Sequence, residues 1–385
     1  MTFSDQLLNR ATAGLVAVII GFSSSIALIY QVVITLGGTP DLVASWLLML
    51  GLVMGITTIG LSYYYKVPVL IAWSTTGAAL LISSAQGYHL GEAIGAFMFA
   101  ATLVFVSGVT GWFEKIMNRI PSELACAMLA GVLVNFGIDV FNFMNELPLV
   151  IGLMVLMYFL GKRFFARFAM LSVLVAGVLL AWQMGHIDTG AIHWKISEFA
   201  YIAPVFNLQA CISIGLPLYI VTMTSQNLPG IAVLKAHNYK APISATLNVT
   251  GFINILTAPF GTYSINLAAI TAAICMSDEA DKSPDKRYWA SIAAGVFYIV
   301  MALCAATLVG LVASLPQALI LALAGIALFG TIANSLQQAL SSAQYTEAAI
   351  VTFLVTASDL TMLSVGSAFW GIIAGVCTLM ITRKS

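Results

Sequence analysis

Long apolar runs follow one another along almost the whole chain, separated by short segments that hold most of the charged residues. A helix needs about 20 apolar residues to cross the hydrocarbon core of a bilayer. The pattern therefore predicts an all-α polytopic membrane protein with fourteen spans. The expected spans cover residues 11–36, 42–64, 68–82, 91–113, 121–141, 146–161, 168–184, 207–227, 241–257, 260–275, 287–312, 316–334, 345–358 and 362–382.

Two of the expected spans are interrupted where a spanning helix should be most regular. "PVLIAWSTTGAA" (68–79) and "PFGTYSINLAA" (259–269) each open with proline, continue through a stretch that favours extended backbone, and then reach serine and small residues. Non-helical backbone is tolerated at membrane depth only where protein buries it or where it lines a cavity. We expect each span to break into a short strand and a half-helix, with Ser74 and Ser264 as the N-caps of the half-helices.

The positions of the lysines and arginines give an orientation. Cytoplasmic loops carry the excess of these residues in membrane proteins. With fourteen spans and a cytoplasmic N-terminus, 14 of the 15 basic residues fall in cytoplasmic segments, and only Lys195 falls outside. Both termini are therefore expected in the cytoplasm.

Composition narrows the classes of function. Hydrophobic residues make up 61% of the 385 residues and charged residues only 8%, whereas about a quarter of the residues in a soluble protein are charged. The formal net charge is zero, so nothing indicates a nucleic-acid partner. The five cysteines stand singly in apolar segments, and no span carries a metal-ligand cluster or a nucleophile–base pair. We expect membrane lipid around the protein, and no metal, cofactor or enzymatic activity.

An internal repeat accompanies the two interrupted spans. "IPSELACAMLAG" (120–131) resembles "LPQALILALAG" (315–325). The interrupted segments match in the same order, with Ser74 aligned to Ser264 at a separation of 190 residues. Seven spans per repeat is an odd number, so the two halves must be inverted relative to each other. Inverted repeats with discontinuous helices are typical of secondary transporters.

The two half-helices predict an anion site. In an inverted repeat the third and tenth spans run in opposite directions, so the N-termini of both half-helices face one point near mid-membrane. Each helix N-terminus carries about half a positive charge, and two together roughly neutralise one carboxylate. The residues expected to hold the anion are Ser74, Thr75, Thr76, Gly77, Ser264 and Asn266.

Two further polar clusters lie in the first and eighth spans, which are related by the repeat. "TMTSQNLPGI" (222–231) places Gln226 and Asn227 at the end of the eighth span, where Pro229 is expected to prevent regular helix continuation. "GFSSSIALIYQ" (21–31) places Ser24 and Ser25 in the first span. Two alternatives stay open: the small polar residues serve close helix packing, or Ser25 bonds back to its own helix.

Acidic residues offer few candidates for proton coupling. No carboxylate or imidazole stands clearly at mid-membrane, because most lie near span ends or in loops. Asp359, in "TASDLTML", is the acid most enclosed by apolar sequence. Ionisable residues inside a membrane usually have a function, so Asp359 is the candidate proton-coupling group.

Several long motifs resemble benzoate:proton symporters of the BenE type. They are "PVLIAWSTTGAALL", "PLYIVTMTSQNLPGIAVLKA", "GTYSINLAAITAAICMS" and "FLVTAS" followed by "GSAFWGIIAG". That family is more distantly similar to nucleobase carriers and anion exchangers with seven-plus-seven inverted repeats. The resemblance implies a core domain formed by residues 1–118 and 200–313, and a gate domain formed by residues 119–199 and 314–385.

The resemblance also implies a function. A secondary active transporter of a bacterial inner membrane would import benzoate, or a similar aromatic monocarboxylate, with protons by an elevator-like alternating-access mechanism. Proton-coupled nucleobase carriers have carboxylates where this chain has Gln226 and Ile265, and uncharged residues suit an anionic substrate. Trp73, Tyr263 and Ile265 would bound the aromatic ring, with Gln226 and Asn227 closing the site. Dimers are common on this fold, so a homodimer is left open. The alternatives are a carrier for nucleobases or other small anions, and a passive anion channel.

Overall fold

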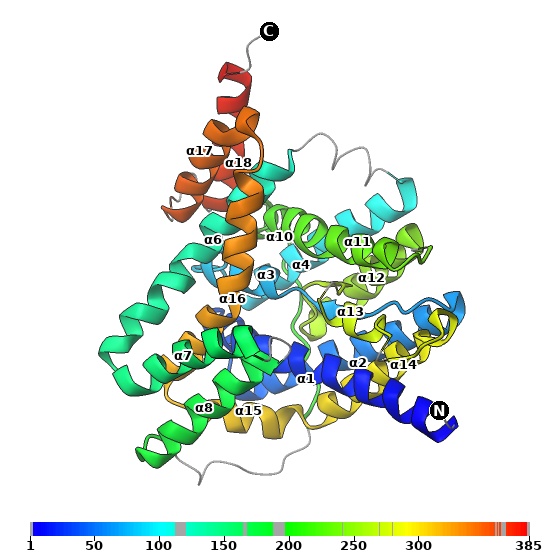
Figure 1. The fold of residues 1–385 in the computed structure, drawn as a ribbon. Helices are drawn as coiled ribbons and strands as arrows, with labels where there is room; N and C mark the ends of the chain where they lie inside the picture. Colours follow the sequence, from blue (N-terminus) through cyan, green and yellow to red (C-terminus); the bar gives the residue numbers. More distant parts are fainter. Residues whose placement is uncertain are drawn as a thin grey trace.

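A computed structural model describes residues 3–111, 121–164, 168–187, 197–240, 242–268, 270–278, 280–358, 360, 362 and 367–382. The described chain is predominantly helical (Figure 1). Helices occupy all fourteen of the ranges in which the apolar pattern predicts a span. On length and composition, seven helices among the described residues can cross a membrane, or eight if the bent pair Pro284–Leu303 and Ala305–Ala313 forms one span. The count of fourteen spans stays a prediction.

The first half of the chain begins with two long helices, followed by a strand, a short helix and four further helices. Its elements are α1 (Phe3–Thr35), α2 (Pro40–Tyr65), β1 (Ile71–Trp73), α3 (Thr75–Ser84), α4 (Leu90–Thr110), α6 (Ser122–Asn142), η1 (Phe143–Asn145), α7 (Pro148–Phe164) and α8 (Ala169–Gln183).

The second half repeats this order with more interruptions. Its elements are α9 (Leu208–Ala210), η4 (Cys211–Gly215), α10 (Leu216–Thr222), η5 (Met223–Asn227), α11 (Leu228–Ala236), α12 (Ile243–Thr257), η6 (Ala258–Phe260), β2 (Ile265–Leu267), α13 (Ile270–Cys275), η7 (Pro284–Lys286), α14 (Tyr288–Leu303), α15 (Ala305–Ala313), α16 (Gln317–Ala339), η8 (Ala343–Tyr345), α17 (Thr346–Ala357) and α18 (Ser367–Thr382).

The helical backbone continues through Pro229, but not as a regular α-helix, in agreement with the expectation from the sequence. A π-helical turn, η5, lies directly before Leu228 and Pro229, and a second, η4, lies directly before Leu216 and Pro217. Proline cannot donate the usual backbone hydrogen bond and crowds the preceding turn. The wider π turn accommodates this defect, so the helix is locally irregular and does not end.

Helices from the two halves of the chain lie side by side. The first-half helix α2 packs along α14, and α4 packs along α12 (Figure 1). Helices α6 and α16, which begin within the repeated segments 120–131 and 315–325, pack against each other. Helix α7 pairs with α8, and α17 pairs with α18. These pairs therefore match each other across the two halves, as expected for an inverted repeat.

A two-stranded antiparallel sheet joins the interrupted segments. Ile71 pairs with Leu267, and Trp73 pairs with Ile265. The strands begin at residues 71 and 265, a separation of 194 rather than the 190 expected from matching the serines. Gly261, just before β2, has a φ of 100°, a conformation that favours glycine.

The shift in register changes the role expected for one serine. Ser74 caps α3 as predicted, because its hydroxyl accepts a 2.8 Å hydrogen bond from the Gly77 N–H. Ser264 instead precedes β2, and α13 begins only at Ile270. The prediction that Ser264 caps a half-helix is therefore wrong. Its hydroxyl lies 2.7 Å from that of Thr222 in the neighbouring helix, and α13 has only six residues.

Candidate functional site

A cavity of about 510 Å³, here called the central cavity, lies at the start of α3. Thr75 and Thr76 of the first turn of α3 line it, together with Thr271 of the first turn of α13. The antiparallel strands that precede these helices bring both starts to this point. Small-molecule sites usually have volumes of about 300–1,000 Å³, so the central cavity has the size of a ligand site.

Hydrogen bonds among hydroxyl and amide groups organise the polar end of the central cavity. The Thr76 Oγ1 lies 2.8 Å from the Ser225 Oγ and accepts a 3.2 Å hydrogen bond from the Gln226 Nε2. The Ser225 hydroxyl donates to the Val221 carbonyl at 2.6 Å, so the Thr76 hydroxyl donates to Ser225. The second N–H of Gln226 takes no part in this bond, and both Gln226 and Thr75 line the cavity.

Aromatic and aliphatic side chains form the apolar part of the lining. Trp73 lines the cavity and packs edge-on against Phe22, with 4.7 Å between the ring centroids. Tyr298 of α14 and Tyr158 of α7 also line it. The aliphatic part consists mainly of Leu28, Met54, Leu129 and Leu328. An aromatic ring therefore has apolar partners within reach of the polar end.

Five of the residues predicted from the sequence line the central cavity: Ser25, Trp73, Thr75, Thr76 and Gln226. Ser25 also donates a 2.6 Å hydrogen bond to the Gly21 carbonyl, so the alternative that it bonds back to its own helix holds as well. These residues come from α1, β1, α3 and η5, which the strand crossing gathers at one place.

The other described residues of the predicted site are buried behind the lining. They are Ser74, Gly77, Asn227, Tyr263, Ser264, Ile265 and Asn266. The Asn227 Oδ1 accepts a 3.1 Å hydrogen bond from the Leu267 N–H, and the Tyr263 hydroxyl donates to the Ser74 carbonyl at 3.2 Å. These residues hold the strand crossing in place, so their positions suit support of the site rather than contact with a ligand. The side chain of Ser24 and all of Asp359 lie outside the described residues.

One helix face and one lysine in the lining were not predicted. Thr331, Asn334, Ser335 and Gln338 of α16 all line the central cavity. Their spacing places them on one face of a helix, and this signal is visible in "TIANSLQQ" (331–338). Lys162 of α7 also lines the cavity, whereas charge placement assigned it only to a cytoplasmic segment.

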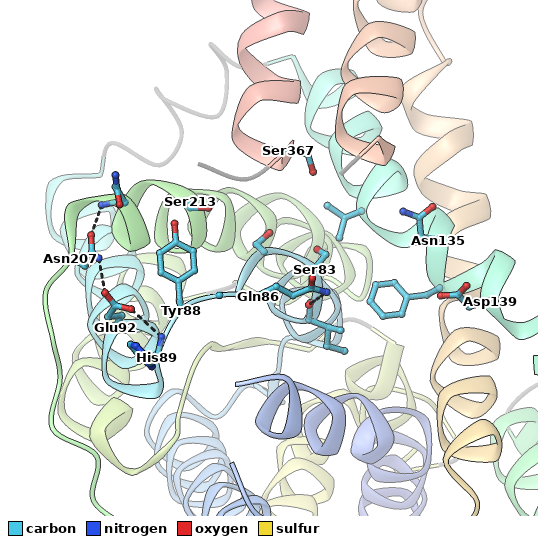
Figure 2. Close-up of a pocket in the computed structure, with 16 residues that line it drawn as sticks. Ser83, Gln86, Tyr88, His89, Glu92, Asn135, Asp139, Asn207, Ser213 and Ser367 are labelled. Atoms are coloured by element: carbon cyan, nitrogen blue, oxygen red, sulfur yellow. Dashed lines mark hydrogen bonds between the residues drawn. The ribbon is translucent and has the colours of Figure 1, made fainter. Parts of the chain in front are cut away.

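A second hollow of about 750 Å³, here called the polar vestibule, lies at the other end of α3 (Figure 2). It is lined mostly by polar residues, among them Ser83, Gln86, His89, Glu92, Asn135, Asp139 and Asn207. The Glu92 carboxylate accepts hydrogen bonds from the Asn207 Nδ2 at 2.6 Å and the His89 N–H at 3.0 Å. On α6, Leu129 lines the central cavity and Val132 lines the vestibule, so about one helical turn separates the two spaces.

Comparison with known proteins identifies relatives along nearly the whole chain. The sequence model of the BenE family, described as "Benzoate membrane transport protein", matches residues 4–381. An Escherichia coli (strain K12) protein, "Inner membrane protein YdcO", is 44% identical over 96% of this chain and 95% of its own length. An Acinetobacter baylyi "Benzoate membrane transport protein" is 35% identical over 99% of this chain and 96% of its own.

Solved structures show the same architecture at low identity. The transmembrane domain of the cyanobacterial bicarbonate transporter BicA aligns over 98% of both chains with a TM-score of 0.62 and 14% identity. The structure of SLC26A9 aligns over 99% of this chain and 66% of its own, with a TM-score of 0.61 and 14% identity. The fold is therefore that of membrane transporters, and the relatives are transport proteins rather than enzymes. The chain belongs to the BenE family of benzoate membrane transport proteins.

Proposed function

We propose that the chain carries benzoate, or a similar aromatic monocarboxylate, across the bacterial inner membrane and binds it in the central cavity. The observation that carries the proposal is the combination, in one cavity, of an aromatic wall at Trp73 and a polar end at Thr75, Thr76 and Gln226. Benzoate has the same division into an apolar ring and a carboxylate. The Acinetobacter baylyi relative, named as a benzoate transport protein, supports this choice of substrate.

The carboxylate would lie at the start of α3. The Ser74 hydroxyl and carbonyl accept hydrogen bonds from the N–H groups of Gly77 and Ala78, so the helix itself does not satisfy those of Thr75 and Thr76. These N–H groups and the second N–H of Gln226 would bind the two carboxylate oxygens. The positive end of the ten-residue helix α3 adds a favourable field. The ring would then pack against Trp73.

Transport would require the two proposed domains to move relative to each other. The core domain (1–118 and 200–313) contains the packed pairs α2–α14 and α4–α12 and both strands. The gate domain (119–199 and 314–385) contains α6–α16, α7–α8 and α17–α18. The central cavity has lining residues from both groups, and a binding site at such a boundary suits an elevator-like mechanism.

The proposed coupling ion is the proton. Asp359 is the candidate coupling group from sequence, and the substrate's own carboxylate is the alternative carrier of the proton. If the segments rich in lysine and arginine are cytoplasmic, both termini, the end of α7 and the start of α8 would lie on the cytoplasmic side. The central cavity reaches Lys162, Ala169 and Met170 and would therefore face the cytoplasm.

Binding to the purified protein tests the substrate. Trp73 lies in the cavity wall, so benzoate should change the intrinsic fluorescence in a saturable way, and isothermal titration should give the same affinity. Uracil serves as the nucleobase comparison. Saturable binding of uracil without binding of benzoate would show that the proposed substrate is wrong.

Reconstituted vesicles test the mechanism. An inward proton gradient should drive accumulation of labelled benzoate above the level in protein-free vesicles, whose leak of benzoic acid is subtracted. Unlabelled benzoate inside the vesicles should accelerate uptake of the label, because a carrier exchanges substrate across the membrane. Uptake that is insensitive to internal substrate would indicate a passive channel instead.

A further inference from the structure

Lys162, near the end of α7, is the only charged side chain among the described residues that line the central cavity. It is exposed, and its Nζ lies 5.6 Å from the centre of the Tyr158 ring. The same Nζ is 3.5 Å from the point that a Cβ on Gly330 would occupy, so the ammonium group reaches α16. In the part of the chain that the structure describes, the ion pairs join Arg10 to Asp281 and Arg287 to Asp278, and Lys162 takes part in neither.

The face of α16 next to Lys162 is polar. Thr331 follows Gly330 directly, and Asn334, Ser335 and Gln338 continue the same face toward the C-terminal end of the helix. Gln338 is anchored, since its Oε1 accepts a 3.1 Å hydrogen bond from the Cys126 thiol of α6. Hydroxyl and amide groups beside an ammonium group can donate hydrogen bonds to an anion. A wall that only closed the cavity around an aromatic ring would need none of these groups.

We infer that Lys162 and the polar face of α16 form a second carboxylate-binding position in the central cavity, separate from the start of α3. This inference rests on the proposed function, because it takes the same aromatic monocarboxylate as its ligand. The first position, at α3, uses N–H groups, whereas the second uses a solvated point charge on the α7–α16 wall. A solvent-facing cation in an otherwise uncharged cavity attracts anions and raises their local concentration. The second position would hold the carboxylate between the α3 site and the end of the cavity at α7 and α8.

A charge series at position 162 tests the inference. Lys162→Arg keeps the charge, Lys162→Gln removes it, and Lys162→Glu reverses it. Benzoate affinity should be nearly unchanged for Lys162→Arg, fall about three- to tenfold for Lys162→Gln and fall further for Lys162→Glu, as expected for one unit charge a few ångströms from an anion near water. The affinity of the unaltered protein should weaken with added salt, and this dependence should be smaller in Lys162→Gln.

The matched control is Arg163, the next residue of α7. Arg163 is also exposed and basic but does not line the central cavity. Arg163→Gln changes the net charge by the same amount, so it should leave benzoate affinity and its salt dependence unchanged. Equal losses in Arg163→Gln and Lys162→Gln would overturn the inference, because they would indicate a general effect of surface charge.

Two results separate this inference from the proposed function. If the unaltered protein binds benzoate and folded Lys162→Gln binds it with the same affinity and salt dependence, the second position is wrong and the substrate stands. If the unaltered protein does not bind benzoate, the substrate is wrong. Elution as a single species in detergent, with an unchanged unfolding temperature, shows that each variant is folded. Should Lys162→Gln fail this criterion, the order of affinities among the unaltered protein, Lys162→Arg and Lys162→Glu decides the inference, since equal affinities would overturn it.

Discussion

The two inverted halves meet in two regions that are built differently. In the crossing region, which comprises β1, β2, α1 and the loop from α13 to α14, the halves are joined by strand pairing and by a buried ion pair. In the helices around α6 and α16, here called the α6–α16 region, the equivalent interfaces are unequal. Helix α17 packs along much of α6, whereas its counterpart α7 contacts α16 only sparsely.

The central cavity lies at the more loosely packed of these two interfaces, the one between α7 and α16. Tyr158 and Lys162 of α7 line the cavity together with α16, while the described residues of α17 and α18 contribute nothing to its lining. The halves are inverted, so a second state can have α7 packed closely on α16 and α17 packed loosely on α6. That state would close the cavity at α7 and open the opposite side at α17. The comparison suggests that the crossing region keeps its shape while the α6–α16 region changes, and the predictions below test each part.

The largest expected effect is in the crossing region. Arg10 of α1 forms a 2.6 Å ion pair with Asp281, and the two side chains are only 10% and 2% exposed. Asp281→Asn would leave the buried Arg10 without its counter-charge, which typically costs about 3–5 kcal/mol. Thermal and chemical unfolding in detergent should show this loss. Asp285→Asn, an exposed acid in the same loop, is the control and should change stability by about 0.5 kcal/mol or less.

The same carboxylate predicts a pH dependence. Burial raises the pKa of Asp281, but hydrogen bonds from the Ser283 N–H and from Arg10 outweigh it, so the pKa lies below its ordinary value. A depressed pKa in the folded state contributes stability above the unfolded pKa of about 3.9, and this stability is lost as the pH falls through the folded pKa. The free energy of unfolding should therefore fall less steeply below about pH 4 in Asp281→Asn than in the unaltered protein. Parallel pH profiles for both proteins would contradict this role.

The next prediction compares two glycines of the α6–α16 region. A Cβ on Gly131 of α6 would lie 2.7 Å from the Phe353 carbonyl oxygen of α17, whereas a Cβ on Gly330 of α16 would come no closer than 3.5 Å to Lys162 of α7. Gly131→Ala should therefore lower stability by about 1–3 kcal/mol through overpacking. Gly330→Ala should leave stability unchanged or slightly raised, because alanine favours helix more than glycine does. Equal unfolding temperatures for the two variants would show that α17 is not packed more tightly than α7.

Much of the fold follows from local sequence patterns. Apolar runs place the helices, and the Pro–Ser arrangement at Pro68 and Ser74 predicts the break and the cap before α3, because both depend on neighbouring residues. Local sequence does not give the alignment of the second interrupted segment with the first. Ser264 looks like Ser74 in sequence, but strand pairing between residues nearly 200 positions apart decides which residue precedes α13.

The part of the central cavity formed by irregular backbone was predictable from the sequence. Trp73, Thr76 and Gln226 lie next to breaks in regular helix, which sequence reveals through proline, glycine and polar residues. Lys162 and Asn334 lie on uninterrupted helices and reach the cavity only because α7 and α16 meet there. Charge placement in the sequence gives the side of the membrane for Lys162 but not the cavity that it lines.

The smallest expected effect compares the two helix starts that line the central cavity. The Thr76 hydroxyl is held by Ser225 and Gln226, whereas Thr271 belongs to the six-residue helix α13. Thr76→Val keeps the shape and removes the hydroxyl that accepts a hydrogen bond from the half-buried Gln226, so it should weaken benzoate binding about tenfold. Thr271→Val should weaken it less than threefold, because a short helix contributes little field at its start. Titration of both variants with benzoate measures the difference. Equal losses would mean that the two halves bind the carboxylate symmetrically, as the simple two-helix picture from sequence predicts.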